Sequence, residues 1–374
     1  MDSREIDYVK AMSKACQSGF STGGDLKLYK RLVVACFAVA GLMFSYTMLI
    51  AQPNSAKPLR TIPVEGKKTA SEQHSAAPQL FVPESFETLS VNSSKELIHK
   101  LREYDLWENP LPTAIPPVIL ERYPQGINKL TVQDKKKAFL HSLLPIALVA
   151  LSEVAEERRQ LQDILEKFTT VPDRFTKEEN GKKAPWLKEL NSSERKFIVK
   201  LTEKYRTTSV SGLLSRVRTV PVSLILAQGA IESSWGSSRF ANKGNNLFGI
   251  WTWGGKGMLP AKREEGKKHL VASYDSLLDS VRAYILMLNR VKAYTQLRTI
   301  RRRSTDPVAL AAGLLNYSER GGVYVSDIGR IIEYNNLRDF DTLTLASSSV
   351  KTAQAASVAT AAGVGAETDN PFPN

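Results

Sequence analysis

Residues 220–236 decide the fold and read VPVSLILAQGAIESSWG. A proline near the start of an apolar run is typical of the first turn of a helix, so this stretch predicts a helix. The run ends in one carboxylate, Glu232, between Ile231 and Trp235. Because burial disfavours the charged form of a carboxyl group, we expect these neighbours to raise the pKa of Glu232. A carboxyl group that stays protonated at neutral pH can serve as a general acid, whereas a glutamate that caps buried backbone would explain the same placement.

A short antiparallel hairpin is predicted directly after this helix. Residues 250–253, IWTW, alternate as a strand does, the glycine-rich residues 254–257 form a turn, and residues 271–274, VASY, return as a second strand. The hairpin region holds aromatic and charged side chains next to the Glu232 helix: Trp251, Trp253, Lys256, Lys262, Arg263, Glu264 and Glu265. Tryptophans serve as platforms for the faces of sugars and equally in packing, so both interpretations stay open.

Further helices complete the domain expected at residues 194–341. Residues 276–300 carry apolar side chains at spacings of three and four, which predicts a long amphipathic helix. Asp306 and Pro307 can cap another helix, and a glycine-bearing loop at residues 317–325 precedes a last one. The domain is therefore expected to be α+β, mainly helical with a small β-hairpin.

The N-terminal part of the chain predicts a membrane anchor. Residues 32–51, LVVACFAVAGLMFSYTMLIA, form an uncharged stretch of the length that spans a bilayer as a helix. Lys30 and Arg31 precede this stretch directly, so residues 1–31 are expected in the cytoplasm and the rest beyond the inner membrane. A cleaved signal peptide is the alternative. Residues 52–93 are rich in Pro, Ser, Ala and Lys and are predicted to be a flexible linker.

A helical region is predicted between this linker and the domain, at residues 94–172. Its main helix begins at Thr131, a capping residue, and Pro145 is expected to kink it. We interpret it as a packing or interaction helix, and the region could also restrain the domain that follows. Residues 173–193 are predicted to be a second linker and residues 342–374 a disordered tail.

The net charge and the positions of the cysteines and histidines indicate which kinds of ligand to expect. The chain of 374 residues carries a formal net charge of +13, and residues 194–341 contain 24 Lys and Arg against 13 Asp and Glu. We expect an anionic ligand, either nucleic acid or a cell wall that bears peptide carboxylates. The two cysteines, Cys16 and Cys36, and the four scattered histidines show no metal-ligand spacing, so neither a metal nor a cofactor is expected.

Four motifs occur in order along the domain: ESSWG at 232–236, NNLFG at 245–249, YDSLLDSV at 274–281 followed by Tyr284, and the pair Tyr317 and Tyr324. In this combination the chain resembles the glucosaminidase family, glycoside hydrolase family 73, and within it the bacterial Bax proteins. The helix that begins at Thr131 resembles the segment preceding the enzyme in Bax-like proteins. The resemblance implies a lysozyme-like fold and an endo-beta-N-acetylglucosaminidase, which hydrolyses the β-1,4 bond after N-acetylglucosamine in peptidoglycan.

The resemblance also implies roles for individual residues. Glu232 becomes the general acid, and the second carboxylate lies in the hairpin, where Glu265 and Glu264 are both candidates. Tyr324 matches a tyrosine near the scissile sugar, where it could orient the substrate acetamide or steady the developing charge. Inversion, retention and catalysis by the substrate acetamide all stay open. The residues expected to bind the glycan strands are Trp235, Asn246, Phe248, Trp251, Trp253 and Tyr317.

Three other functions stay open at this point. A lytic transglycosylase also uses one glutamate on a lysozyme-like scaffold, and it leaves an anhydro-muramyl end rather than a reducing N-acetylglucosamine end. A wall-binding module would hold the same glycan without cutting it. The arginines at 301–303 suggest nucleic-acid binding as a third function. The expected topology, however, puts the domain outside the cytoplasm, and arginines at a helix end also complement the helix dipole.

Overall fold

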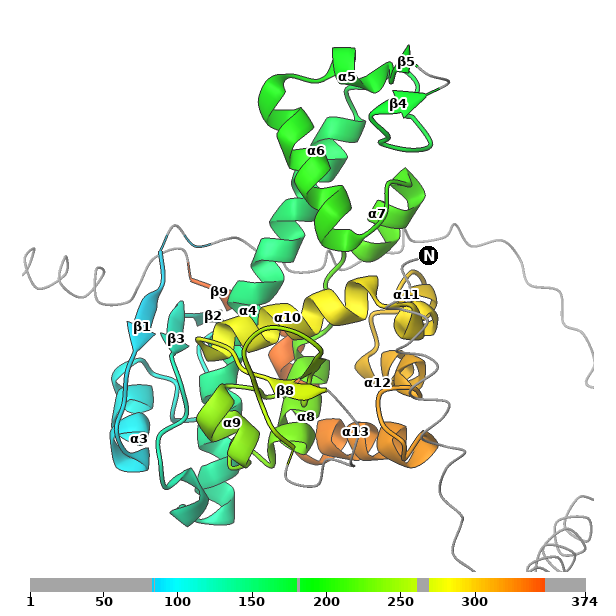
Figure 1. The fold of residues 1–374 in the computed structure, drawn as a ribbon. Helices are drawn as coiled ribbons and strands as arrows, with labels where there is room; N and C mark the ends of the chain where they lie inside the picture. Colours follow the sequence, from blue (N-terminus) through cyan, green and yellow to red (C-terminus); the bar gives the residue numbers. More distant parts are fainter. Residues whose placement is uncertain (1–82, 84, 180–181, 261–268, 347–374) are drawn as a thin grey trace, which may run out of the picture. The chain divides into compact units, whose positions relative to one another are not determined.

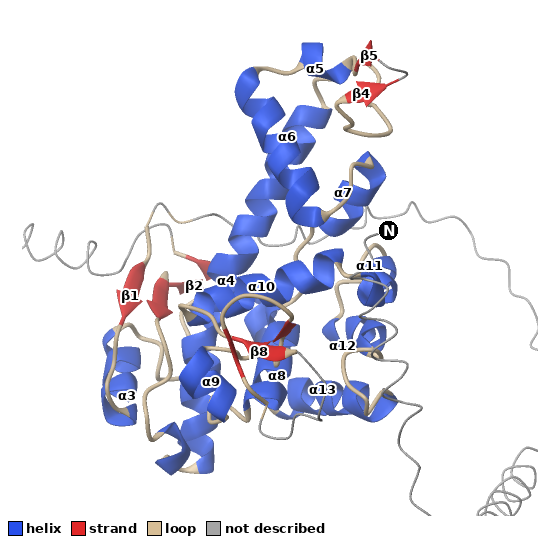
Figure 2. Ribbon diagram, viewed as in Figure 1, coloured by secondary structure: helices blue, strands red, loops and turns tan. Residues whose placement is uncertain are grey.

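The computed structural model describes most of the chain beyond its first 82 residues, all of it within the unit Ala76–Asn374 (Figure 1). The described residues are 83, 85–179, 182–260 and 269–346. The predicted membrane helix at 32–51 and the candidates Glu264 and Glu265 lie outside them, as do residues 1–31 and most of the predicted linker and tail. The described part is mainly helical with short strands, which confirms the expected α+β class (Figure 2).

The elements follow one another in two groups along the chain. The first group is β1 (Glu87–Leu89), α3 (Ser94–Glu103), β2 (Ala114–Ile115), β3 (Val118–Leu120), η1 (Ile127–Lys129), α4 (Val132–Leu165), β4 (Glu178–Glu179), β5 (Lys182–Lys183), α5 (Trp186–Glu189), α6 (Ser192–Tyr205) and α7 (Val210–Arg216). The second is α8 (Val222–Ser233), α9 (Arg239–Gly244), β6 (Trp251–Thr252), β7 (Gly257–Met258), β8 (Leu270–Ala272), α10 (Leu277–Arg290), η2 (Lys292–Tyr294), α11 (Thr295–Ile300), α12 (Pro307–Ala311), η3 (Ala312–Leu314), α13 (Gly322–Tyr334), η4 (Leu337–Thr342) and β9 (Thr344–Leu345).

Helix α4 is the central helix of the fold. Its N-terminus is capped as predicted, because the Thr131 side chain accepts a hydrogen bond from the backbone N–H of Asp134 at 3.1 Å. The helix continues for 34 residues through Pro145. Among the described helices it alone is long and apolar enough to cross a membrane, but 89% of its most apolar stretch is buried inside the protein. We therefore explain its composition by its place in the core, where it packs against α8 and α10.

One core joins the N-terminal region to the domain expected at 194–341. Buried apolar side chains of a single cluster come from segments between Leu89 and Leu345. Within this body, β2 pairs in parallel with β9, and each strand contributes a buried residue to the core, Ile115 and Leu345. On α4, the buried His141 ring donates from Nδ1 to the carbonyl oxygen of Leu106 at 2.8 Å, and its edge meets Phe340. Residues 94–154 thus share one hydrophobic core with the domain that follows them.

A second hydrophobic cluster surrounds the C-terminal end of α4. Residues 173–193, expected to be a linker, contain β4, β5 and α5. Phe175 and Trp186 meet edge to face at 5.1 Å within this cluster, and the Trp186 indole donates to the carbonyl of Thr176 at 2.7 Å. Figure 1 shows these short elements beside α6 and α7 at one end of α4. Two buried aromatic rings therefore anchor the described parts of this polar segment in the cluster.

Helix α8 receives its N-terminal cap from a distant residue. Pro221 at the cap position has no side-chain donor or acceptor to offer. Instead, the Asp341 carboxylate accepts hydrogen bonds from the Ser223 backbone N–H at 2.8 Å and the Ser223 hydroxyl at 2.6 Å. Gly229 lets α8 approach α4, since an added Cβ would lie 3.0 Å from Leu143. Both contacts fix the helix that carries Glu232.

The first arginine of the run at 301–303 is a buried structural residue. Arg301 donates to the carbonyl oxygens of Ser215 and Arg218, at 3.0 and 2.9 Å, and to the Asn289 side chain at 2.7 Å. Burial lowers the pKa of Arg301 to about 9. It joins the end of α11 to the segment between α7 and α8, so it is not available to bind a nucleic acid. Arg302, next to it, is exposed.

We expect Arg301→Met to lower the free energy of unfolding by about 3 kcal/mol, because it leaves buried carbonyl groups without donors. Arg302→Met is the matched control and should change this free energy by less than about 0.5 kcal/mol. Urea denaturation of the full chain measures both. Equal effects of the two variants would contradict the structural role of Arg301.

Candidate active site

Glu232 lies in the last turn of α8 with its side chain half-buried. Burial raises the pKa of its carboxyl group, and this effect exceeds the lowering by a hydrogen bond from Tyr324 and by the positive charge of Arg320. Gly249 lies beside the carboxylate, since a Cβ added there would be 3.6 Å from Glu232 Oε2. The arrangement keeps the carboxyl group largely out of water and favours its protonated form.

Two tyrosines predicted for the site come together beside Glu232. Tyr324, in the first turn of α13, is buried, and hydrogen bonding by its hydroxyl lowers the pKa of the Glu232 carboxyl group. The Tyr317 ring stacks on the Tyr324 ring with centroids 5.5 Å apart and planes 5° from parallel. The Tyr317 hydroxyl donates to the carbonyl oxygen of Phe248 at 2.8 Å. These contacts tie the loop before α13 to the loop after α9.

Buried hydrogen bonds lead to Tyr324 from two residues, Tyr284 and Gln228, that the sequence did not assign to the site. The Tyr284 hydroxyl donates to Gln228 Oε1, and Gln228 Nε2 donates to the Tyr324 hydroxyl oxygen at 2.9 Å. Tyr324 in turn bonds to Glu232. The one available signal was spacing, because Gln228 precedes Glu232 by four residues and so lies on the same face of α8.

Asn246 and Phe248, predicted to bind glycan, have their side chains engaged inside the protein. The Asn246 amide donates to the carbonyl oxygens of Ile250 and Ala272, both at 2.9 Å, and accepts from the Ile250 N–H at 3.1 Å. Phe248 is 1% exposed and stacks on Tyr284 at a centroid distance of 4.0 Å. Both residues therefore shape the loop that passes Glu232 rather than offer a surface to a ligand.

Trp235 packs on α4 from a tight turn after α8. Ser234, Trp235 and Gly236 all have positive φ angles, of 51°, 59° and 76°. The indole ring lies with its edge to Phe139 at 5.9 Å and under the Lys136 ammonium group at 4.9 Å. The ring is partly buried by these contacts, so its first role is to anchor the end of the Glu232 helix.

The exposed Trp251 lies on a small antiparallel sheet, and the exposed Trp253 follows the end of its strand β6. The predicted pairing is confirmed, since Trp251 on β6 lies opposite Val271 on β8, and the structure adds β7 as a third strand. Trp251 and Trp253 are 50% and 56% exposed, and the Trp251 ring stacks on His269 at 4.2 Å. Exposed indole faces of this kind are available to a ligand. The stretch that holds Glu264 and Glu265 connects β7 to β8.

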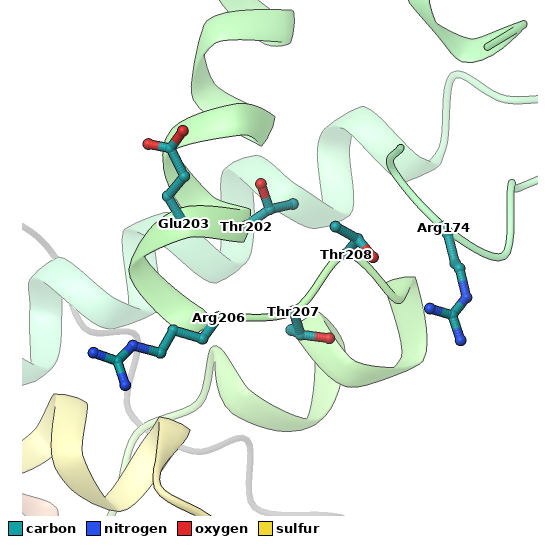
Figure 3. A pocket seen from close by; sticks show the side chains of 6 residues that line it. All are labelled: Arg174, Thr202, Glu203, Arg206, Thr207 and Thr208. Carbon is teal, nitrogen blue, oxygen red and sulfur yellow. The ribbon is translucent and has the colours of Figure 1, made fainter. Parts of the chain in front are cut away.

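A separate pocket lies among α6 and the loop before α7 (Figure 3). It has a volume of about 500 Å³ and is lined by Arg174, Thr202, Glu203, Arg206, Thr207 and Thr208. The Arg174 and Arg206 guanidinium groups point in different directions in Figure 3 and do not converge on one ligand. In the part of the chain that the structure describes, no group of His, Cys, Asp and Glu is arranged to hold a metal ion.

Comparison with known proteins gives a family for part of the chain. Residues 213–337 match the family model Glucosaminidase, described as mannosyl-glycoprotein endo-beta-N-acetylglucosaminidase. This segment is a glucosaminidase-family domain. Glu232 and its tyrosine partners all lie within it. The resemblance stated from the sequence motifs is thus confirmed, and the domain is of a glycoside hydrolase family.

Two individual proteins are similar to this chain. Protein bax of Escherichia coli (strain K12) is 28% identical over 212 residues, which are 55% of this chain and 69% of that protein. The solved catalytic domain of the autolysin Auto from Listeria monocytogenes is 20% identical and covers 40% of this chain and 89% of its own, with a TM-score of 0.27.

We expect Asn246→Ala to lower the free energy of unfolding by about 3 kcal/mol, because it leaves buried carbonyl and N–H groups of the loop without partners. Trp253→Ala, at an exposed ring 7 positions further along, should lower it by less than about 1 kcal/mol. Urea denaturation distinguishes the two. A negligible loss for Asn246→Ala would return that residue to the candidates for ligand binding.

Proposed function

We propose that this chain is a peptidoglycan hydrolase that cleaves the β-1,4 bond after N-acetylglucosamine, with Glu232 as general acid. The observation that carries the proposal is a half-buried carboxyl group, held by Tyr324, whose pKa is raised by burial inside a glucosaminidase-family domain. A glycosidic oxygen must receive a proton as its bond breaks, and a carboxyl group with a raised pKa keeps such a proton to a higher pH than an ordinary glutamate does.

The proton moves from Glu232 to the leaving oxygen of the glycan. The carboxylate that remains accepts the hydrogen bond of the Tyr324 hydroxyl and lies in the field of Arg320. Because Tyr324 is buried and its hydroxyl is engaged by Gln228 and Glu232, we assign it to steadying Glu232 rather than to holding the substrate acetamide. Both contacts stabilise the charge that develops as the bond breaks.

The substrate surface is proposed to include the sheet next to Glu232. Trp251 and Trp253 offer exposed rings to sugar faces, and the excess of basic residues in the domain suits a wall that bears peptide carboxylates. Glu264 and Glu265 stay the candidates for a second carboxylate. Whether the anomeric centre inverts depends on how far that group lies from Glu232.

The place of action proposed is the outer side of the inner membrane. Residues 32–51 would anchor the chain with residues 1–31 in the cytoplasm, and residues 52–93 would give the domain reach toward the wall. The glycan strands of peptidoglycan are then the available anionic polymer.

Digestion of purified sacculi tests the proposal. We expect the full chain to release fragments with reducing N-acetylglucosamine ends, identified by mass spectrometry. Glu232→Gln should lower the rate at least about a hundredfold and leave sacculus binding unchanged, because the amide cannot donate an acidic proton. Glu319→Gln, an exposed carboxylate of the loop before α13, is the matched control and should retain the wild-type rate.

The other outcomes identify the competing functions. Anhydro-muramyl ends would show a lytic transglycosylase. Binding without release by the wild-type chain would show a wall-binding module. Equal rates for wild type and Glu232→Gln would remove Glu232 from the mechanism.

A further inference from the structure

Gln228 is a fully buried amide in an otherwise apolar stretch of α8. Its exposure is 0%, and buried neighbours on the helix include Ile225, Leu226 and Ala230. A buried amide without partners would cost stability, and this one has a partner at each end. Its oxygen accepts from Tyr284 and its nitrogen donates to Tyr324.

These two partners determine which way each proton points. Tyr284 occupies Gln228 Oε1 as a donor, so the amide presents Nε2 to Tyr324. The Tyr324 oxygen accepts that N–H at 2.9 Å, so its single hydroxyl hydrogen remains for another acceptor, and hydrogen bonding by this hydroxyl lowers the pKa of Glu232. The chain of donors thus runs in one direction and ends at Glu232.

We propose that Gln228 is a positioning residue, which fixes the Tyr324 hydroxyl as a donor to Glu232 and so prepares Glu232 to release its proton. The inference rests on the proposed function, since it concerns the acid of that reaction. Gln228 acts through Tyr324 and does not touch the glycan.

The charged and titratable groups around Glu232 determine whether the pKa of Glu232 rises or falls when Gln228 is replaced. Tyr324 from α13 and Arg320 from the loop before it favour the carboxylate form. Tyr284 from α10 and Tyr317 stay neutral, because burial raises their pKa well above the usual value. A Tyr324 hydroxyl that can turn away from Glu232 stabilises the carboxylate less, so the pKa of Glu232 rises and its proton leaves less readily.

The test is the pH profile of kcat/KM for sacculus digestion by the full chain. An acid catalyst is active below its pKa, so activity falls as pH rises through the pKa of Glu232. Gln228→Met keeps the volume and removes both hydrogen bonds of the amide. We expect the part of the profile where activity falls with rising pH, the high-pH limb, to move to higher pH. At low pH, where activity no longer depends on pH, we expect kcat/KM to be lower by about fivefold, the effect of one net hydrogen bond.

A double-mutant cycle shows whether Gln228 acts through Tyr324. Tyr324→Phe alone should move the limb to higher pH, and adding Gln228→Met to it should move the limb no further. Ser223→Ala is the matched control, because it removes another buried hydrogen bond of α8, to Asp341, and should lower stability without moving the limb.

Tyr284→Phe gives a second and milder test. It deletes one buried hydroxyl, frees the Gln228 amide to turn over, and should move the limb in the same direction as Gln228→Met. If Gln228→Met does not fold, the shift of the high-pH limb in Tyr284→Phe tests the proposal by itself.

The experiments distinguish failure of the Gln228 proposal from failure of the proposed function. Loss of wild-type digestion, or activity of Glu232→Gln, would reject the proposed function itself. If digestion depends on Glu232 but neither Gln228→Met nor Tyr284→Phe moves the high-pH limb, the proposed role of Gln228 is wrong and the proposed function stands. A further shift in the Tyr324→Phe background would also overturn it, because Gln228 would then act by another route.

Discussion

The partial burial of Glu232 is the constraint on which the rest of the site depends. A carboxyl group at the end of a buried helix loses the hydration that favours its charge, so its pKa rises unless other groups compensate. Here Tyr324 and Arg320 compensate in part. The placement requires α8 to lie deep in the core, and α4 supplies the surface that covers it, with Gly229 allowing the close approach. The long apolar helix α4 is thus part of what buries Glu232.

Local signals in the sequence were sufficient for several elements, because caps and periodicity act over a few residues. Thr131 caps α4, and the sheet pairs Trp251 with Val271, as the sequence predicts. Contacts between distant segments leave no such signal. The pairing of β2 with β9 and the cap that Asp341 gives to α8 could not be predicted, and residues 94–172 were therefore assigned to a region of their own.

The same distinction holds within the site. A carboxylate at the end of an apolar helix is visible in the sequence, so Glu232 could be found. A motif shows that Asn246 is present next to this helix, but its orientation depends on backbone groups of the sheet, which its amide in fact binds. Gln228 was missed because its partners, Tyr284 and Tyr324, come from two other helices. The direction of a side chain, rather than its residue type, decides whether it faces a ligand or holds other parts of the protein in place.

The pKa of Glu232 in the uncleaved, substrate-free chain tests the central claim most directly. It can be followed by carbon-13 NMR of labelled glutamate carboxyl groups during a pH titration, with Glu232→Gln to assign the signal. We predict a pKa above the ordinary glutamate value of 4.5, since burial outweighs the two compensating groups. A value at or below 4.5 would show that burial does not raise the pKa of Glu232 and would contradict this claim.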